Sequence, residues 1–156
     1  MRTVFWVGLV TFILDQVTKY WVVHTLKLDR VGTIEVFPPF FNLQMAWNYG
    51  INFGLFAGNN DTTRWILIAI ALLISGAVLA WVYFDPAGRW QKIAAGFLVG
   101  GAIGNVVDRV LYGAVADFIN TSCCGFSNPY SFNIADIAVF VGAFGMIVFS
   151  TDKKAA

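Results

Sequence analysis

Charged residues are scarce in this sequence. Asp, Glu, Lys and Arg account for 12% of its 156 residues, whereas a soluble domain usually carries about 25%. The ten basic and nine acidic residues nearly cancel, so the chain offers no basic face for nucleic acid. Apolar residues are abundant at 58%, and aromatic residues make up 17%. This composition is typical of a membrane protein, and we expect membrane lipids as partners and no nucleic acid.

Histidine and cysteine are almost missing as well. His24 is the single histidine, and Cys123 and Cys124 are adjacent, so these residues cannot supply the three or four well-spaced ligands of a zinc site. We interpret the cysteines as small, partly buried residues, with a strained vicinal disulfide as the alternative. Neither G-x-S-x-G nor H-E-x-x-H occurs, which argues against a serine or metallo intramembrane protease.

Four apolar segments approach the roughly 20 residues that a helix needs to cross a bilayer. They cover about residues 4–23, 65–84, 93–112 and 134–150. The first resembles a signal peptide because Arg2 precedes it, but Asp15 and Lys19 interrupt it and no small-residue cleavage site follows. We therefore predict a retained helix and an all-α membrane protein, a single domain over residues 1–156 with four transmembrane helices.

The basic residues beside these segments predict the orientation. One side of the membrane carries Arg2, Arg89, Lys92, Lys153 and Lys154, and the other carries Lys27, Arg30 and Arg64. The excess of Lys and Arg in short loops marks the cytoplasmic side. We therefore predict cytoplasmic termini and two extracytoplasmic loops, about residues 27–63 and 113–131.

The first of these loops contains the pattern of a strand. In "NLQMAWN", from Asn42 to Asn48, polar or small residues alternate with apolar ones, which is the period of a half-buried strand. Pro38 and Pro39 end any helix before it. We predict a small extracytoplasmic β-sheet on the outer membrane surface, while the second loop forms a short outer-loop segment.

Ionisable residues interrupt two of the apolar segments. A charge near the bilayer centre costs about 2.5 to 3.5 kcal/mol on insertion scales, so such residues usually face the protein interior and find partners. Asp15 and Lys19 are spaced i, i+4 and share a helix face, either as a neutralising ion pair or as part of a polar site. Asp108 and Arg109 are consecutive and each needs a partner elsewhere, whereas Asn105 and Arg109 share a face.

Two further carboxylates are expected at similar depth. The third helix runs outwards and places Asp117 just beyond the outer interface, and the fourth begins on the same side with Asp136 in its first turn. Two carboxylates that approach each other in a poorly solvated site share a proton near neutral pH. Such a pair can activate water for hydrolysis. The alternatives are a structural polar cluster and a proton relay in a transporter.

Five short blocks carry a resemblance to a known family. They are "DQVTK" at 15–19, "NYGINFG" at 48–54, "GNVVDR" at 104–109, "VADF" at 115–118 and "FNIAD" at 132–136. Each block alone is weak, but five in this order among four apolar segments are specific. Through them nearly the whole chain resembles the bacterial lipoprotein signal peptidases, also called signal peptidase II.

The resemblance implies an aspartic endopeptidase of the bacterial inner (cytoplasmic) membrane, with its active site at the outer face. Its substrates would be diacylglyceryl-modified prolipoproteins, cleaved on the N-terminal side of the lipidated cysteine, and globomycin would inhibit it. The small sheet would cradle the substrate beside the membrane. We expect a monomer that requires no metal or organic cofactor.

The resemblance also assigns roles to residues. Asp117 and Asp136 match the catalytic pair. Asn48, Asn105 and Arg109 match positions that bind substrate backbone or globomycin. Residues expected to support the site are Gly50, Asp15, Lys19, Asp108, Asn133 and Ala135.

Two other classes of function compete with this interpretation. A small proton-coupled transporter also uses intramembrane Asp, Lys and Arg, but usually shows inverted repeats and broken helices, which this sequence lacks. A non-catalytic membrane partner would use the polar groups only for structure, and would keep its function in Asp117→Asn and Asp136→Asn variants.

Overall fold

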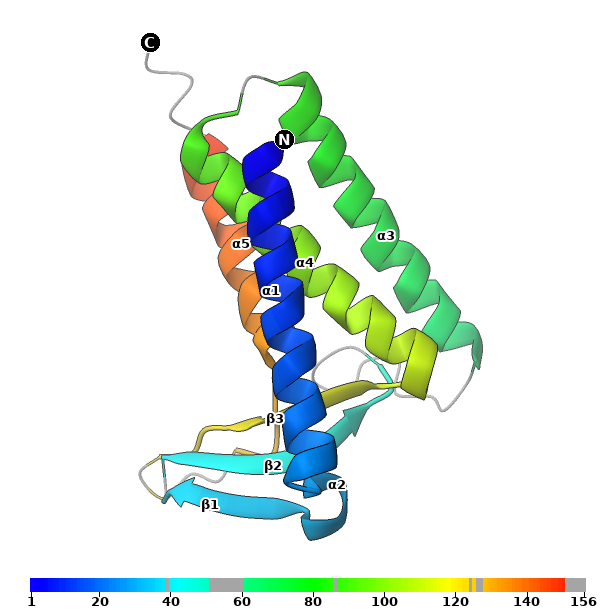
Figure 1. The fold of residues 1–156 in the computed structure, drawn as a ribbon, viewed down its shortest axis with the longest axis vertical. Coiled ribbons are helices and arrows are strands. Elements are labelled where there is room, and N and C mark those ends of the chain that lie inside the picture. The colour runs from blue at the N-terminus through cyan, green and yellow to red at the C-terminus, as the bar shows by residue number, and fades with distance from the viewer. Residues whose placement is uncertain (39, 51–60, 86, 124, 126–127, 151–156) are drawn as a thin grey trace.

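The fold is described from a computed structural model, which describes residues 1–38, 40–50, 61–85, 87–123, 125 and 128–150. The predictions that concern Pro39, residues 51–54, Cys124, Lys153 and Lys154 lie outside these ranges. The elements in order are α1 (Arg2–Tyr20), the π-helix η1 (Trp21–Thr25), α2 (Leu28–Val31), β1 (Thr33–Phe37), β2 (Phe41–Asn48), α3 (Asp61–Phe84), α4 (Arg89–Tyr112), β3 (Val115–Asn120) and α5 (Ile134–Ser150). The four long helices form a bundle, with the sheet at the end away from the N-terminus (Figure 1).

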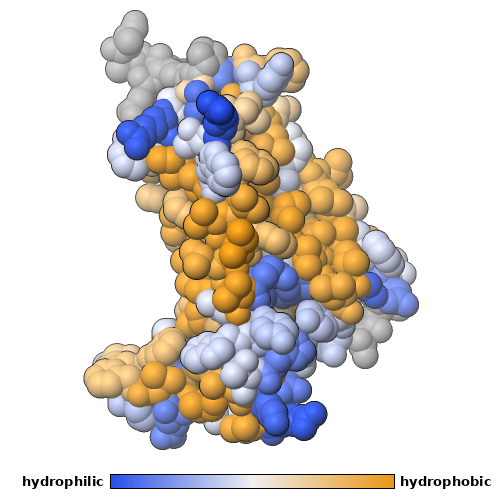
Figure 2. Space-filling view, viewed as in Figure 1, coloured by the Kyte–Doolittle hydropathy of each residue, from blue (hydrophilic) through white to orange (hydrophobic). Residues whose placement is uncertain are grey.

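Within the described residues, two helices are long and apolar enough to cross a membrane. These are α3 and α4, with 24 residues each, while α5 is a shorter apolar helix of 17 residues. Large apolar side chains point outwards, such as Leu73 on α3 and Phe140 on α5, which are 72% and 74% exposed. Figure 2 shows apolar residues over the middle of the helices and hydrophilic ones at the N-terminal end and around the sheet. The mostly helical fold with a small sheet is as predicted, and the count of four spans stays a prediction.

Glycines bring α4 into backbone contact with its neighbours. A Cβ added at Gly100 would lie 2.5 Å from the carbonyl oxygen of Gly8 on α1, and one at Gly101 would lie 2.5 Å from that of Ala135 on α5. Small residues allow this approach where lipid supplies no hydrophobic force between helices. These glycines therefore serve the packing of helices against one another. Helix α4 is therefore the central helix, against which α1 and α5 are fixed.

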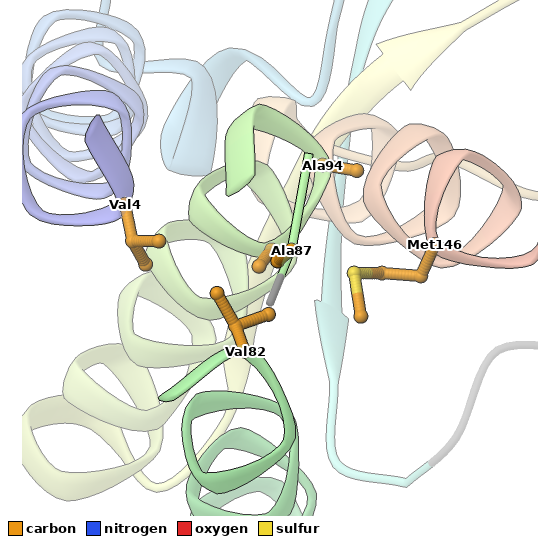
Figure 3. Close-up of a cluster of buried hydrophobic side chains, with 6 residues drawn as sticks. Val4, Val82, Ala87, Ala94 and Met146 are labelled. Atoms are coloured by element: carbon orange, nitrogen blue, oxygen red, sulfur yellow. The ribbon is translucent and has the colours of Figure 1, made fainter. Parts of the chain in front are cut away.

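A cluster of apolar side chains holds the bundle together near the N-terminus. Val4 of α1, Val82 of α3, Ala94 of α4 and Met146 of α5 meet there, with Ala87 from the α3–α4 connection (Figure 3). All five are buried, at 9% exposure or less. This cluster joins all four long helices at the end opposite the sheet.

The sheet is antiparallel, with β2 between β1 and β3. The predicted strand over residues 42–48 is confirmed as β2. Strand β3 was not predicted, because the sequence assigned residues 113–131 to an outer loop. Five of its six residues are buried, so both faces of the strand are covered. Its sequence "VADFIN" therefore lacks the alternation of polar and apolar residues that identifies a half-exposed strand. Its pairing of Asp117 with Ala46 of β2 places this aspartate on a regular strand and not on a loop.

The interpretation of the cysteines as small, partly buried residues is wrong for Cys123, whereas the alternative, a disulfide, agrees with the structure. This residue follows β3, is exposed and is disulfide-bonded. An exposed position after the strand offers no apolar packing for a free thiol. Its neighbour Cys124 lies outside the described residues.

Candidate active site

Asp117 and Asp136 come together around one residue, Asn133. The Nδ2 atom of Asn133 donates a hydrogen bond of 2.6 Å to Oδ1 of Asp117. The backbone N–H of Asn133 donates to Oδ2 of Asp136 at 3.3 Å. The two carboxylates that the topology placed at similar depth therefore share a common hydrogen-bond donor, although they lie on a strand and a helix that are separate in sequence.

Asn133 also explains why Asp136 has a fixed orientation. Its Oδ1 atom accepts a 2.8 Å hydrogen bond from the backbone N–H of Asp136, and α5 begins at the next residue, Ile134. This reciprocal pair is a capping box, in which the first residue caps the helix and the side chain three residues later returns to it. The sequence "NIAD" thus satisfies two backbone donors at the helix terminus and holds one oxygen of Asp136 in place.

The other oxygen of Asp136 is held by Asn105 of α4. Asn105 Nδ2 donates to Asp136 Oδ1 at 2.9 Å. Its own Oδ1 accepts from Lys19 Nζ at 3.1 Å and from Asn133 Nδ2 at 3.2 Å. An amide has two donors and one acceptor oxygen, and two donors already face this oxygen. The Nδ2 group of Asn105 must therefore point to the carboxylate, and Lys19 helps to set this orientation.

Lys19 belongs to a buried ionic triad. Its Nζ atom lies 2.8 Å from Asp15 Oδ2 and 2.9 Å from Asp108 Oδ2, and all three residues are at most 5% exposed. Asp15 Oδ1 accepts from the backbone N–H of Ala135 at 2.9 Å, and Asp108 Oδ2 accepts from that of Ala116 at 3.2 Å. The triad thus connects α1, α4, α5 and β3. The predicted pairing of Asp15 with Lys19 is confirmed, and the pair also contacts Asn105 beside Asp136.

Asn48 and Gly50 connect the end of β2 to the same cluster. Asn48 Nδ2 donates to Asp117 Oδ2 at 3.0 Å, and its Oδ1 accepts from the backbone N–H of Gly50 at 3.1 Å. Arg109 on α4 donates from Nη2 to the carbonyl oxygen of Gly50 at 3.0 Å. Arg109 Nη1 also donates to the carbonyl oxygen of Asn105 at 3.4 Å. The guanidinium therefore holds the chain that leaves β2 against the end of α4.

Burial controls the protonation of Asp117. The residue is only 2% exposed, and this burial, together with the negative charge of Asp136, raises the pKa of Asp117 from 3.8 to about 7. Hydrogen bonds from Asn48 and Asn133 act in the opposite direction. Desolvation outweighs these donors because a charged carboxylate loses its hydration in the site. At neutral pH, Asp117 therefore exchanges a proton readily.

The structure brings together all the residues that the sequence predicted for the site, from Asp15 to Asp136. The site residues predicted from the sequence did not include Gln16, whose Nε2 donates to Asp15 Oδ2 and to Asp108 Oδ1, both at 3.1 Å. A polar amide in an apolar segment was the signal that could have identified it. Within the described ranges no group of three or more His, Cys, Asp and Glu side chains is placed to hold a metal ion, and the expectation of no cofactor stays a prediction.

Comparison with known proteins identifies the family. The model of signal peptidase (SPase) II matches residues 7–151, which is most of the chain. The chain belongs to the signal peptidase II family. This confirms the family that the five sequence blocks indicated, and it makes the protein a protease.

Relatives in the signal peptidase II family match over most of their length. The lipoprotein signal peptidase of Rhodopseudomonas palustris is 39% identical over 143 residues, which cover 90% of this chain and 86% of the relative. That of Sphingopyxis alaskensis is 42% identical over 133 residues, or 85% of this chain and 76% of the relative. That of Vibrio parahaemolyticus is 35% identical over 150 residues, which cover 96% of this chain and 88% of the relative.

Two solved structures of bacterial membrane enzymes share the fold. One, determined by the in meso method at 2.3 Å resolution, has a TM-score of 0.82 at 31% identity and covers 99% of this chain and 91% of its own. The other, at 1.9 Å resolution, has a TM-score of 0.78 at 31% identity and covers 97% of this chain and 94% of its own. The bundle with its small sheet is therefore the architecture of a membrane enzyme.

Proposed function

We propose that this signal peptidase II is an aspartic endopeptidase that removes the signal peptide from diacylglyceryl-modified prolipoproteins. It cleaves on the N-terminal side of the lipidated cysteine, and Asp117 and Asp136 activate the hydrolytic water. The observation that carries the proposal is the pair of carboxylates bridged by Asn133. The name of the relatives, lipoprotein signal peptidase, supports the substrate class.

The two carboxylates suit opposite tasks in this reaction. Asp117, with its raised pKa of about 7, donates its proton to the carbonyl oxygen of the scissile bond. Asp136, held by Asn105, takes a proton from water as the water oxygen attacks the carbonyl carbon. A tetrahedral gem-diol forms. The C–N bond then breaks as Asp136 passes its proton to the leaving nitrogen, and a hydroxyl of the gem-diol returns a proton to Asp117, which restores the starting state.

Polar side chains around the pair are suited to hold the substrate. Asn48, Asn105 and Arg109 carry N–H groups beside the two aspartates, and we assign them the binding of substrate carbonyls or of globomycin-type inhibitors. Gly50, Asn133 and Ala135 support the site through backbone and side-chain hydrogen bonds. Correct placement of reacting groups lowers the barrier substantially, which gives these contacts a catalytic purpose.

We further propose that α1, α3, α4 and α5 all span the inner membrane. The 17 residues of α5 extend over about 26 Å at 1.5 Å per residue, close to the roughly 30 Å of the hydrocarbon core. The basic residues at the N-terminal end support cytoplasmic termini. The sheet and the aspartates then lie at the outer face, where the scissile bond reaches water while the acyl chains of the substrate stay in lipid.

The test compares the purified wild type with Asp117→Asn and Asp136→Asn on a diacylglyceryl-modified prolipoprotein. Asp29→Asn is a matched control, because Asp29 is an exposed carboxylate on α2. We expect the wild type and the control to cleave before the modified cysteine, globomycin to block cleavage, and both site variants to be inactive though folded. Cleavage by both variants at the wild-type rate would reject the catalytic pair. Absence of cleavage by the wild type would reject the proposed substrate class.

A further inference from the structure

An apolar groove of about 500 Å³ lies between α1, α3 and α4. Its lining includes Val4, Phe5 and Leu9 of α1, Leu79 of α3, and Val99 and Ile103 of α4, and every lining residue is apolar or glycine. None of the residues of the candidate active site lines it. The groove is therefore a separate feature, within the size range of small-molecule pockets.

The close contact between α1 and α4 forms the floor of the groove. Gly8 and Gly100 line it, and these are the residues whose backbones meet, since a Cβ at Gly100 would lie 2.5 Å from Gly8 O. A glycine pair leaves no side chain to fill the space above it. Water does not occupy a cavity without polar partners, and the bilayer core contains none to enter. An apolar group must therefore fill the groove in the membrane.

Basic residues gather at the N-terminal end of the groove. Val4, a lining residue, belongs with Ala87 to the buried cluster of Figure 3. This cluster places Arg2, two residues before Val4, at the same end of the bundle as Arg89, two residues after Ala87, and both arginines are exposed. Lys92, on the next turn of α4, is half-buried.

The acidic residue facing this end is Asp85, which accepts a hydrogen bond of 3.3 Å from Trp81 Nε1. The described part of this end therefore carries three cations, Arg2, Arg89 and Lys92, against one carboxylate. An apolar groove that ends at a net positive charge matches a ligand with an apolar chain and an anionic head.

We propose that this groove binds an anionic phospholipid, with an acyl chain between α1, α3 and α4 and the phosphate against Arg2 and Arg89. Guanidinium groups bind phosphate through paired hydrogen bonds. The apolar helix of a signal peptide fits less well, because its flanking region is positively charged and would meet charges of the same sign. The inference requires these helices to lie in a membrane, but it does not depend on the peptidase reaction.

The test measures the lipid retained by the full-length protein after transfer from nanodiscs that contain equal parts of phosphatidylglycerol and phosphatidylcholine. Native mass spectrometry identifies and counts the bound lipid. Leu9→Trp fills the groove from α1, and Val99→Phe fills it from α4. The control is Val10→Trp, since Val10 is the neighbouring residue on α1 but is 53% exposed and does not line the groove.

We expect the wild type and Val10→Trp to retain one phosphatidylglycerol, and both groove-filling variants to retain about tenfold less, a loss of about 1.4 kcal/mol of binding. In the double variant Arg2→Gln/Arg89→Gln the preference for phosphatidylglycerol over phosphatidylcholine should disappear. Circular dichroism and thermal unfolding check that each variant is folded. If one groove-filling variant fails to fold, the other still tests the inference.

Three results would overturn the inference. The first is equal lipid retention by the groove-filling variants and Val10→Trp. The second is equal retention of the two lipids by the wild type, which would show that the net negative charge of the head group is not recognised. The third is a synthetic lipoprotein signal peptide that displaces the phospholipid and crosslinks to a photoreactive group at Val99. Lipid retention is measured without substrate turnover, so failure here and failure of the peptidase assay are distinguishable.

Discussion

The side-chain nitrogen of Asn133 lies 2.6 Å from a carboxylate oxygen of Asp117. The same residue caps the helix that carries Asp136. One asparagine therefore links the folding of α5 to the position of both carboxylates.

Replacing Asn133 should affect stability and activity differently in two variants. Asn133→Ala removes the helix cap and the bond to Asp117, and we expect a loss of about 1 kcal/mol in the free energy of unfolding together with a loss of cleavage. Asn133→Ser keeps a capping oxygen, so it should unfold like the wild type while still losing cleavage. Thermal unfolding and the prolipoprotein assay measure the two effects. Full activity of Asn133→Ser would show that the bond to Asp117 has no catalytic part.

The raised pKa of Asp117 predicts a pH-dependent stability. The carboxyl group titrates near 3.8 in the unfolded chain and at about 7 in the folded protein, so between these values the folded state binds the proton more tightly. Its contribution to stability is therefore fully present below about pH 4 and is lost as the pH rises through 7. Thermal unfolding measured across this range should show a decline that is absent in Asp117→Asn. The same decline in the variant would assign the effect to another group.

Removing Lys19 should destabilise the buried triad. Lys19→Met leaves the carboxylates of Asp15 and Asp108 without their cation, and loss of one partner from a buried ion pair costs about 3 to 5 kcal/mol. Chemical unfolding in detergent measures this change. As a control, Lys27→Met alters an exposed lysine and should shift stability by no more than about 0.5 kcal/mol. A similar small effect for Lys19→Met would show that the triad contributes little to the fold.

The glycine contact at the centre of the bundle predicts a further effect on stability. Gly100→Ala forces a Cβ to within 2.5 Å of Gly8 O, so α1 and α4 must separate, at a cost of about 1 to 3 kcal/mol. Gly76 on α3 has no atom within 4 Å of the position that a Cβ would take. Gly76→Ala should therefore be neutral or slightly stabilising. Comparable destabilisation by the two substitutions would contradict the role of close packing.

Much of the fold could be predicted from the sequence, because long, mostly apolar segments reveal helices in a membrane protein. The predicted segment 134–150 coincides with α5, whereas α3 begins at Asp61, four residues before the predicted start at residue 65. Its first turn, "DTTR", is polar and adds nothing to an apolar pattern. Strand β3 was missed for the opposite reason, since it is buried on both faces.

Parts of the site could also be predicted, because the spacing of polar residues along a helix shows which of them share a face. Asp15 and Lys19 share a helix face, so their spacing alone indicated the pair. The orientation of Asn105 could not be predicted, because it depends on contacts with Lys19 and Asn133 from distant parts of the chain. The cap formed by "NIAD" was visible in the sequence but was not recognised, since Asn and Asp replace the more familiar Ser and Glu.

The hydrogen bond from the backbone of Ala135 to Asp15 joins residues 120 positions apart. Proteins are synthesised from the N-terminus, so α1 is made long before α5. Until the last helix arrives, Asp15 lacks this partner and Asp117 has no second carboxylate beside it. The proposed catalytic pair is thus completed only after α5 has been made, and we expect a nascent chain that carries only α1 to β3 to lack a working site.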